Sequence, residues 1–332
     1  MVLHTHIKEI KEMLLTSEAE LLSMHKGWNI PWEEIRLDHE LGRGAFGIVS
    51  KGLWRGMTVA VKSGEDQDTK MLLGLPDDLM LEMNTLRSVR HPNIVLFFGG
   101  GRKPDGATFI VLEYVELGTL TGYLELNPAI PWSLKLSFCH DAAKGMTHLH
   151  SLNRMHRDLK SPNLLVSASK CLKVADFGTA AITGSSAKIP SDLVCLPHNT
   201  HTIDMDDLLE PNLHTTQVGT VLWMAPEILE QVMKNSGPKL IPYDCSVDLY
   251  SFGIVMWEIA SQRLPWLGVT KNLLQMILNG ERPFVDTAAW APAYCTLLQR
   301  CWATSPKDRP SFAEVCFALK LQISDQLCTT SV

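Results

Sequence analysis

The pattern of apolar residues changes once along the chain, and this change constrains the fold more than any other feature. Between residues 35 and 115, apolar runs such as "NIVLFFGGG" and "ATFIVLEYV" are separated by Gly, Asp and Pro, which is typical of β-strands. One helix interrupts them, with its first turn near Asp78 and its body in "LMLEMNTLRSV". From about 117 to 152 and from 221 to 322 the pattern is helical. The sequence therefore predicts an α+β protein with a small β-rich part and a larger helical part.

Two segments lie outside this division. Residues 4–24 carry apolar side chains at helical spacing, with Lys and Glu between them, until Pro31 breaks the pattern. We expect a helical extension over residues 1–34 that packs on the neighbouring domain, with a dimer or partner helix as the alternative. Residues 183–216 are rich in turn formers, and a loop of this length is usually functional or disordered.

The charge and cysteine content exclude several classes of protein. The chain of 332 residues has 30 basic and 36 acidic side chains, a net charge of −6, which argues against a general nucleic-acid binder. Its eight Cys form no CxxC motif and have no zinc-finger spacing to His, so we expect free thiols. The start of the chain is polar, and the most apolar run, "FGIVMWEIA", is too short to span a bilayer. We therefore expect a cytoplasmic protein without a transmembrane segment.

A glycine-rich motif, "LGRGAFGIV", occupies residues 41–49. In a dinucleotide-binding fold this motif opens a helix, but here the strand pattern "RGMTVAVK" follows it. A glycine-rich hairpin can cover a nucleotide and present backbone N–H groups to its phosphates. Taken alone, the motif fits a plain hairpin equally well.

Lys62 ends an apolar strand, and taken alone it would most simply face water. If it faced inward, it would need an anionic partner. Glu82 can supply one, because it shares a helix face with the apolar Leu86 and Val89. A Glu on a core face is unusual unless it is paired.

These features and three further motifs occur in the order found in eukaryotic protein kinases: the hairpin, "VAVK", Glu82, "HRDLKSPN", "DFG" and "APE". Residues 35–322 thus resemble a protein kinase domain. The motifs "GTVLWMAPEIL" and "RCWATSPKDRPSF" are most similar to the tyrosine kinase-like group, which includes mixed-lineage and Raf-type kinases. The resemblance implies a bilobal fold with an N-lobe (35–115), a C-lobe (116–322), a long activation segment (176–227) and a C-terminal tail (323–332).

The resemblance also implies catalytic roles. Lys62 would hold the α- and β-phosphates of ATP and be held by Glu82. Asp158 would accept the proton of the substrate hydroxyl, Lys160 would stabilise charge on the γ-phosphate, and Thr220 would hydrogen-bond near them. Asn163 and Asp176 would ligate Mg²⁺, with Mn²⁺ as an alternative. The ATP-binding residues implied are Leu41, Gly42, Arg43, Gly44, Ala45, Phe46, Gly47, Val49, Ala60, Lys62, Leu112, Glu113, Val115 and Leu165.

Other residues receive structural roles from the same resemblance. Leu86, Phe97, His156 and Phe177 should stack as an apolar column between the lobes. Glu227 and Arg309 should form a buried ion pair, and Asp248 should anchor the backbone of the catalytic loop.

The expected function is transfer of the γ-phosphate of ATP to Ser or Thr hydroxyls of protein substrates, because Lys160 and Gly219-Thr220 differ from the usual tyrosine-kinase pattern. A dual-specificity kinase is an alternative. A pseudokinase scaffold is disfavoured, because the Lys, Asp and Asn of the motifs are all present. Arg157, with Lys173, is expected to hold a phosphorylated activation segment. Phosphorylation is expected at Thr215 or Thr216, by an upstream activator or within a homodimer.

Overall fold

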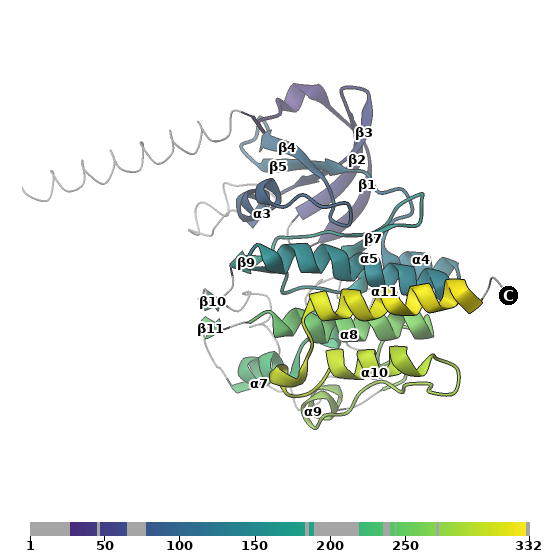
Figure 1. The fold of residues 1–332 in the computed structure, drawn as a ribbon. Coiled ribbons are helices and arrows are strands. Elements are labelled where there is room, and N and C mark those ends of the chain that lie inside the picture. Colours follow the sequence, from purple (N-terminus) through teal and green to yellow (C-terminus); the bar gives the residue numbers. More distant parts are fainter. Residues whose placement is uncertain are drawn as a thin grey trace, which may run out of the picture.

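The computed structural model describes residues 27–44, 47–64, 78–182, 186–188, 219–234, 240–242, 244–269 and 272–329. These residues form a β-sheet lobe above a helical lobe (Figure 1), which confirms the predicted α+β fold. Three predictions lie outside the described residues: the helix over 4–24, the phosphorylation at Thr215 or Thr216, and the ATP contacts of Ala45 and Phe46.

The upper lobe contains one antiparallel sheet with the strand order β1-β2-β3-β5-β4. Helix α3 (Asp78–Ser88) packs against β4 and β5. The strands are β1 (Ile35–Gly44), β2 (Gly47–Trp54), β3 (Met57–Ser63), β4 (Phe97–Arg102) and β5 (Thr108–Glu113).

Alternation along β3 separates two apolar layers in this lobe. Val59 and Val61 are buried against Phe109 and Val111 of β5 on one face of the sheet. Successive side chains of a strand point to opposite faces, so Lys62 is directed toward the other face, where α3 lies.

The free edge of the sheet at β4 is covered by the chain that precedes β1. The Ile30 amide donates to the Gly100 carbonyl and the Gly100 amide donates to the Trp28 carbonyl, both at 2.9 Å. The Trp28 ring stacks on Phe97, with 5.4 Å between ring centroids. Glycine is required at this edge, because a Cβ on Gly99 would collide with the Trp28 carbonyl oxygen and the Ile30 side chain.

The lower lobe is built around α8 (Ser246–Ser261), which is buried on almost every side. A helix that is apolar all round belongs in a core. Two carboxylates, Asp248 and Glu258, are nevertheless buried within it. The other helices are α4 (Leu120–Leu126), α5 (Trp132–Ser151), α7 (Pro226–Lys234), α9 (Leu273–Leu278), α10 (Pro292–Cys301) and α11 (Phe312–Thr329).

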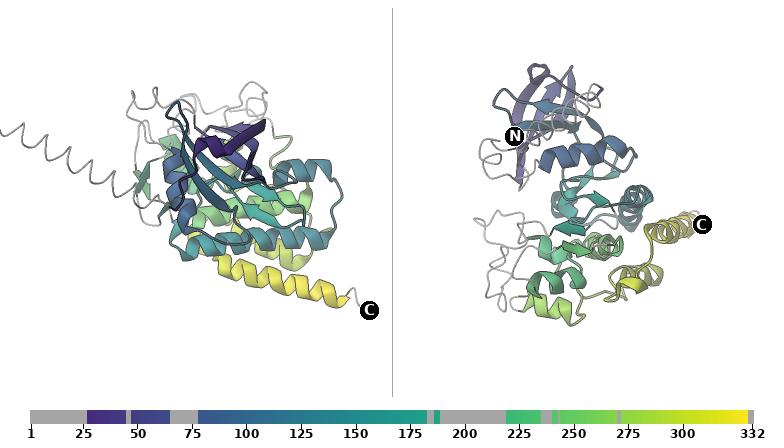
Figure 2. Two further views of the ribbon diagram at one scale, coloured as in Figure 1. Left: turned by 90° about the horizontal axis from the view of Figure 1, so that it is seen from above. Right: turned by 90° about the vertical axis from the view of Figure 1, so that its left-hand side faces the viewer.

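Helix α11 packs against α5 along the outside of the helical lobe (Figure 2). The domain boundary expected at residue 322 falls inside this helix, which continues to Thr329. Residues 323–329, expected as part of a C-terminal tail, therefore continue this helix.

Short strands and 3₁₀ turns connect the helices. β10 lies within the long loop expected over 183–216 and pairs antiparallel with β11, so part of that loop has regular structure. The short strands are β6 (Arg154–Met155), β7 (Leu164–Val166), β8 (Leu172–Val174), β9 (Ala181–Ile182), β10 (Ser186–Lys188) and β11 (Leu240–Pro242). The 3₁₀ turns are η1 (Trp32–Glu34), η2 (Ser161–Asn163), η5 (Gly219–Trp223) and η6 (Pro306–Asp308).

Candidate active site

Lys62 contacts two carboxylates, Glu82 of its own lobe and Asp176 of the helical lobe. Its Nζ lies 2.8 Å from Glu82 Oε2 on α3 and 2.7 Å from Asp176 Oδ1, which follows β8. Lys62 is 6% exposed and Glu82 is fully buried. The inward orientation and the predicted Lys62–Glu82 pair are therefore present, and Asp176 lies in the same cluster.

The Lys62 ammonium group and the two carboxylates shift one another's pKa values. Burial alone would lower the pKa of Lys62, but the charges of Asp176 and Glu82 outweigh it and raise the pKa above its ordinary value. Burial opposes ionisation of Asp176 too, yet Lys62 holds the pKa of Asp176 below its usual value. Burial and the Asp176 charge raise the pKa of Glu82. At neutral pH the site therefore presents a permanent ammonium group beside the ionised Asp176.

The loop between β6 and β7 supplies the second polar group. Lys160 Nζ lies 2.9 Å from Asp158 Oδ2. Asn163 Nδ2 donates to the Asp158 carbonyl at 2.8 Å and to Asp158 Oδ2 at 3.0 Å. The loop thus brings together Asp158, Lys160 and Asn163, to which the resemblance gives separate roles, with Asp158 at the centre.

Asp248 fixes the backbone of this loop from below. Its carboxylate accepts hydrogen bonds from the His156 amide at 2.9 Å and the Arg157 amide at 2.8 Å, and lies 2.8 Å from His150 Nε2. Arg157 has a φ of 67° and Asp176 a φ of 62°, a region that costs non-glycine residues on the order of 1–3 kcal/mol. Tertiary contacts such as those of Asp248 offset this strain.

The expected apolar column is consistent with the packing. Leu86, Phe97, His156 and Phe177 are all buried. The rings of His156 and Phe177 lie 5.2 Å apart, and His156 Nε2 is 3.0 Å from the Ala175 carbonyl oxygen. The column therefore passes beside the catalytic loop and the start of the activation segment.

The described residues expected to contact ATP lie in β1, β2, β3, β5 and β7 and in the hinge, the stretch from Leu112 to Val115 that ends β5 and leads toward the helical lobe. Leu112 and Val115 are buried, whereas Val49, Ala60 and Leu165 are half-buried. In the hairpin itself, Leu41, Gly42 and Arg43 are exposed and Gly44 pairs with Gly47. At Gly47, φ is 120° and a Cβ would collide with the Ser63 carbonyl oxygen, so this position requires glycine.

Glu113 ends β5 and ties the hinge to the helical lobe. Its Oε1 accepts a hydrogen bond from the Leu96 amide at 2.7 Å and lies 2.8 Å from Lys173 Nζ. The prediction that Lys173 acts beside Arg157 is therefore wrong, because the ammonium group is committed to the hinge. Arg157 instead donates through Nε to the Thr179 carbonyl, at the start of the activation segment.

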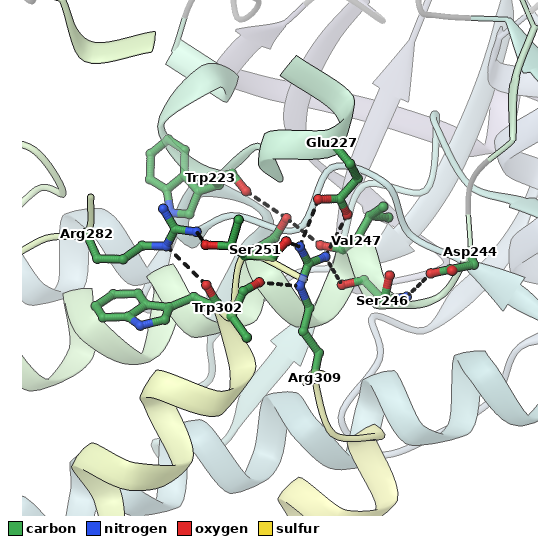
Figure 3. Close-up of polar contacts among 11 residues, drawn as sticks. Trp223, Glu227, Asp244, Ser246, Val247, Ser251, Arg282, Trp302 and Arg309 are labelled. Carbon is green, nitrogen blue, oxygen red and sulfur yellow. Dashed lines mark hydrogen bonds and ion pairs between the residues drawn. The ribbon is translucent and has the colours of Figure 1, made fainter. Parts of the chain in front are cut away.

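The end of the activation segment is fixed by the predicted ion pair (Figure 3). Arg309 Nη1 and Nη2 lie 2.7 and 2.8 Å from the two carboxylate oxygens of Glu227. The Arg309 side chain is fully buried and that of Glu227 is 25% exposed. Thr220 belongs to η5 in the same region, but its predicted side-chain contact is outside what the structure describes.

The oxygen atoms of Asn163 and Asp176 fit a hard divalent cation. The Asn163 amide nitrogen is directed to Asp158, which leaves its amide oxygen as the atom able to ligate. Asp176 is ionised, and carboxylate and carbonyl oxygens are the ligands that Mg²⁺ prefers. Asn163 and Asp176 would supply two of the six oxygen ligands that Mg²⁺ takes, and phosphate oxygens and water would supply the others.

Two polar contacts were missed by the sequence analysis. The Glu113 side chain was assigned no role, because only its backbone was expected to matter. Glu258 binds the indole of Trp223 and the hydroxyl of Ser161. Its signal was visible in the sequence as a lone carboxylate inside the apolar run "FGIVMWEIA".

Comparisons with known proteins agree with this geometry. The model of the family described as "Protein kinase domain" matches residues 35–318. The "Probable serine/threonine-protein kinase drkD" of Dictyostelium discoideum is 36% identical over 319 residues, 93% of this chain and 22% of that protein. The "Serine/threonine-protein kinase CTR1" of Arabidopsis thaliana is 31% identical over 293 residues, 86% of this chain and 31% of that protein.

The chain thus spans less than a third of the length of these relatives. Among the described helices, none combines the length and the apolar character needed to cross a membrane. The family model, the bilobal fold and the Lys62–Glu82–Asp176 cluster agree, and the chain belongs to the protein kinase domain family.

Proposed function

We propose that this chain is an ATP-dependent protein serine/threonine kinase of the tyrosine kinase-like group. The observation that carries the proposal is the assembled site, in which Lys62 contacts both Glu82 and Asp176 while Lys160 contacts Asp158. Phosphoryl transfer requires mainly alignment and neutralisation of charge, and these residues supply both.

In the proposed mechanism each residue has one task. Lys62 holds the α- and β-phosphates of ATP, and Glu82 keeps the ammonium group in place. Asp158 orients the substrate hydroxyl and accepts its proton, and Lys160 stabilises the charge of the γ-phosphoryl group. Mg²⁺, or Mn²⁺ in its place, would be held by Asn163 and Asp176 and would neutralise phosphate charge.

The adenine ring would lie between the half-buried side chains of Val49, Ala60 and Leu165, with the backbone of Glu113 and Val115 as its polar partners. The glycine-rich hairpin would cover the phosphates with its backbone N–H groups. This assignment is supported by the requirement for glycine at position 47, where no Cβ fits.

Specificity for Ser and Thr is supported by the contact of Lys160 with Asp158 and by the names of the two relatives, both serine/threonine-protein kinases. Dual specificity is the alternative. The substrates would be intracellular proteins, and all the described Cys are free thiols, as in a reducing compartment.

We propose further that phosphorylation of Thr215 or Thr216, by an upstream kinase or a second copy, orders the activation segment through Arg157. The contact of Arg157 with Thr179 supports this, since it places the guanidinium group beside the segment. A double Thr215→Ala, Thr216→Ala variant should then phosphorylate a peptide much more slowly than wild type, and an unchanged rate would contradict the idea.

Transfer of labelled phosphate to a peptide array tests the main proposal. Wild type should label Ser and Thr peptides, while Asp158→Asn and Lys62→Met should lose at least about a hundredfold in rate. Equal labelling by all three proteins would mean a contaminating kinase. Labelling of Tyr peptides alone would contradict the specificity, and ATP binding without transfer would indicate a pseudokinase.

A further inference from the structure

Glu258 is a buried carboxylate that the proposed chemistry does not use. It lies near the C-terminal end of α8, is 2% exposed, and is surrounded in sequence by apolar residues. Burial raises its pKa to about 8, although hydrogen bonds from Ser161 and Trp223 oppose this rise. Burying a carboxylate costs several kcal/mol, and an apolar residue would fill an apolar helix without that cost. The contacts of the carboxylate therefore need an explanation.

The carboxylate of Glu258 has one partner on each oxygen. Ser161 Oγ donates to Oε1 at 2.7 Å, and Trp223 Nε1 donates to Oε2 at 2.6 Å. Thr121 Oγ1 on α4 donates to Ser161 Oγ at 2.8 Å. These four residues form the Glu258 network, which connects α4, η2, η5 and α8.

Two of these elements belong to the reacting parts of the site. Ser161 directly follows Lys160 and begins the turn η2, which ends at Asn163. Trp223 ends η5, the segment that leads into "APE" and that shapes the protein-substrate groove in kinases. Glu258 thus joins the loop that carries the reacting groups to the segment that would receive the substrate.

Helix α8 holds Trp223 at two points. Ser251 Oγ donates to the Trp223 carbonyl oxygen at 2.9 Å, as Figure 3 shows, and Glu258 accepts from the indole at the other end of the residue. Trp223 is 5% exposed. The backbone and the ring of Trp223 are thus both bound to α8. Because Glu258 binds Ser161 as well, it sets the position of Trp223 relative to Ser161.

The hydrogen-bond chemistry makes a carboxylate the suitable group. An indole N–H can only donate, so Oε2 must accept. Ser161 already accepts from Thr121, so its own hydroxyl proton is directed to Oε1. The ionised carboxyl group, which predominates above its pKa of about 8, satisfies both donors in this arrangement. A Gln in its place could accept from Trp223, but its NH₂ group would face Ser161 and force both hydroxyls to turn.

We infer that Glu258 is a positioning residue that holds the substrate-groove segment at Trp223 in register with the catalytic loop at Ser161. This inference rests on the proposed kinase function and deepens it. Within the described part of the chain, the hydrogen bonds of the network join Thr121, Ser161, Trp223 and Glu258, none of which is expected to bind ATP, so its loss should affect the protein substrate more than the nucleotide.

Steady-state kinetics with separate titration of peptide and ATP test this inference. Glu258→Leu, assayed well below its unfolding temperature, should raise the KM for the peptide about tenfold or more and change the KM for ATP less than about twofold. Glu258→Gln should recover part of the loss, since it keeps one acceptor for Trp223. Ser161→Ala should give a smaller defect of the same kind.

A double-mutant cycle keeps the test decisive if Glu258→Leu does not fold. Combining Ser161→Ala with Glu258→Gln should cost less than the sum of the two single changes, since both act on one network. Additive effects, or equal changes in the KM for peptide and for ATP, would overturn the inference and leave a purely structural role.

Asp141→Asn is the matched control. Asp141 is also a buried carboxylate of the helical lobe, but it accepts from the Leu172 amide at 3.0 Å and lies 2.9 Å from Lys144. Its replacement should lower the unfolding temperature without changing the ratio of the two KM values. Wild-type protein that transfers no phosphate would overturn the proposed function and this inference together. An active wild type without the expected KM pattern would overturn the inference alone.

Discussion

Replacing Glu227 by Gln removes the negative charge that pairs with the buried guanidinium group of Arg309. Arg309 has five N–H donors, and each has an acceptor. Two bind the carboxylate of Glu227, and the other three bind the backbone carbonyls of Ser246, Ala303 and Thr304 at 3.0, 2.9 and 3.2 Å. Three of these contacts depend on chain segments outside the activation segment, so the guanidinium group cannot follow Glu227 if that residue changes.

The cost of Glu227→Gln follows from this arrangement. The amide oxygen of Gln can still accept one guanidinium N–H, but its NH₂ group faces the second one, so one charge-assisted hydrogen bond is lost and a buried cation loses its counter-ion. Breaking a buried pair costs about 3–5 kcal/mol. Because the Glu227 side chain is 25% exposed, water can replace part of the lost interaction. We therefore expect a loss of about 2–3 kcal/mol in the free energy of unfolding, and a fall of about 5–10 °C in the unfolding temperature.

Thermal and urea unfolding measure this loss directly. Glu230→Gln is the matched control, because it makes the same chemical change on the exposed face of the same helix, where substitutions usually cost less than about 0.5 kcal/mol. A fall of less than about 1 °C for Glu227→Gln, or a fall equal to that of the control, would refute the argument. Such a result would mean that the three carbonyls satisfy Arg309 without the carboxylate.

Three further predictions concern other parts of the molecule. Burial lowers the pKa of His150, but the hydrogen bond and charge of Asp248 raise it to about 9, above the value of about 6.5 for an exposed His. The resulting stabilisation is complete below about pH 6.5 and is lost as the pH rises through about 9, by on the order of 3 kcal/mol. The unfolding temperature of His150→Gln should therefore vary less over this range than that of wild type, and parallel curves would contradict the assignment. Trp28→Ala removes the stack on Phe97 and should lower the free energy of unfolding in urea by about 2 kcal/mol, because the ring is half-buried; a change within about 0.5 kcal/mol would show that the stack adds little. Asn163→Ala should raise the Mg²⁺ concentration for half-maximal activity at least about tenfold, whereas an unchanged metal dependence would exclude Asn163 as a ligand.

The lobes could be predicted from the sequence because their signals are local. Strand alternation and helical spacing appear within a few residues of one another, so the division near residue 115 was visible before the fold was known. The contact of Trp28 with Phe97 was not, since it joins segments about 70 residues apart and leaves no periodic pattern. The extent of α11 was missed for another reason. The domain end at 322 was inferred from the resemblance, and the resemblance does not describe how far a terminal helix continues.

The sequence motifs were sufficient to identify the candidate site residues. The direction of each side chain depends on the strand or loop that carries it. Lys173 is the instructive error. It lies in β8 between Leu172 and Val174, both buried, so alternation directs its side chain to the opposite face, toward Glu113. The sequence carried that information, but a motif-based expectation ignored it. The partners of Glu258 could not be predicted, because its two donors lie 97 and 35 residues away along the chain.

Because the edge of β4 is covered by residues that precede the matched domain, the solubility of the protein should depend on those residues. The family match begins at residue 35, yet the backbone of Gly100 is satisfied by residues 28 and 30. Proteolytic removal of residues before 35 would leave an open strand edge beside the uncovered ring of Phe97. Such an edge is a template for strand addition by another molecule, so the trimmed protein should self-associate and precipitate while its catalytic groups remain intact. We therefore expect residues 28–30, which precede the matched domain, to protect this strand edge from pairing with another molecule.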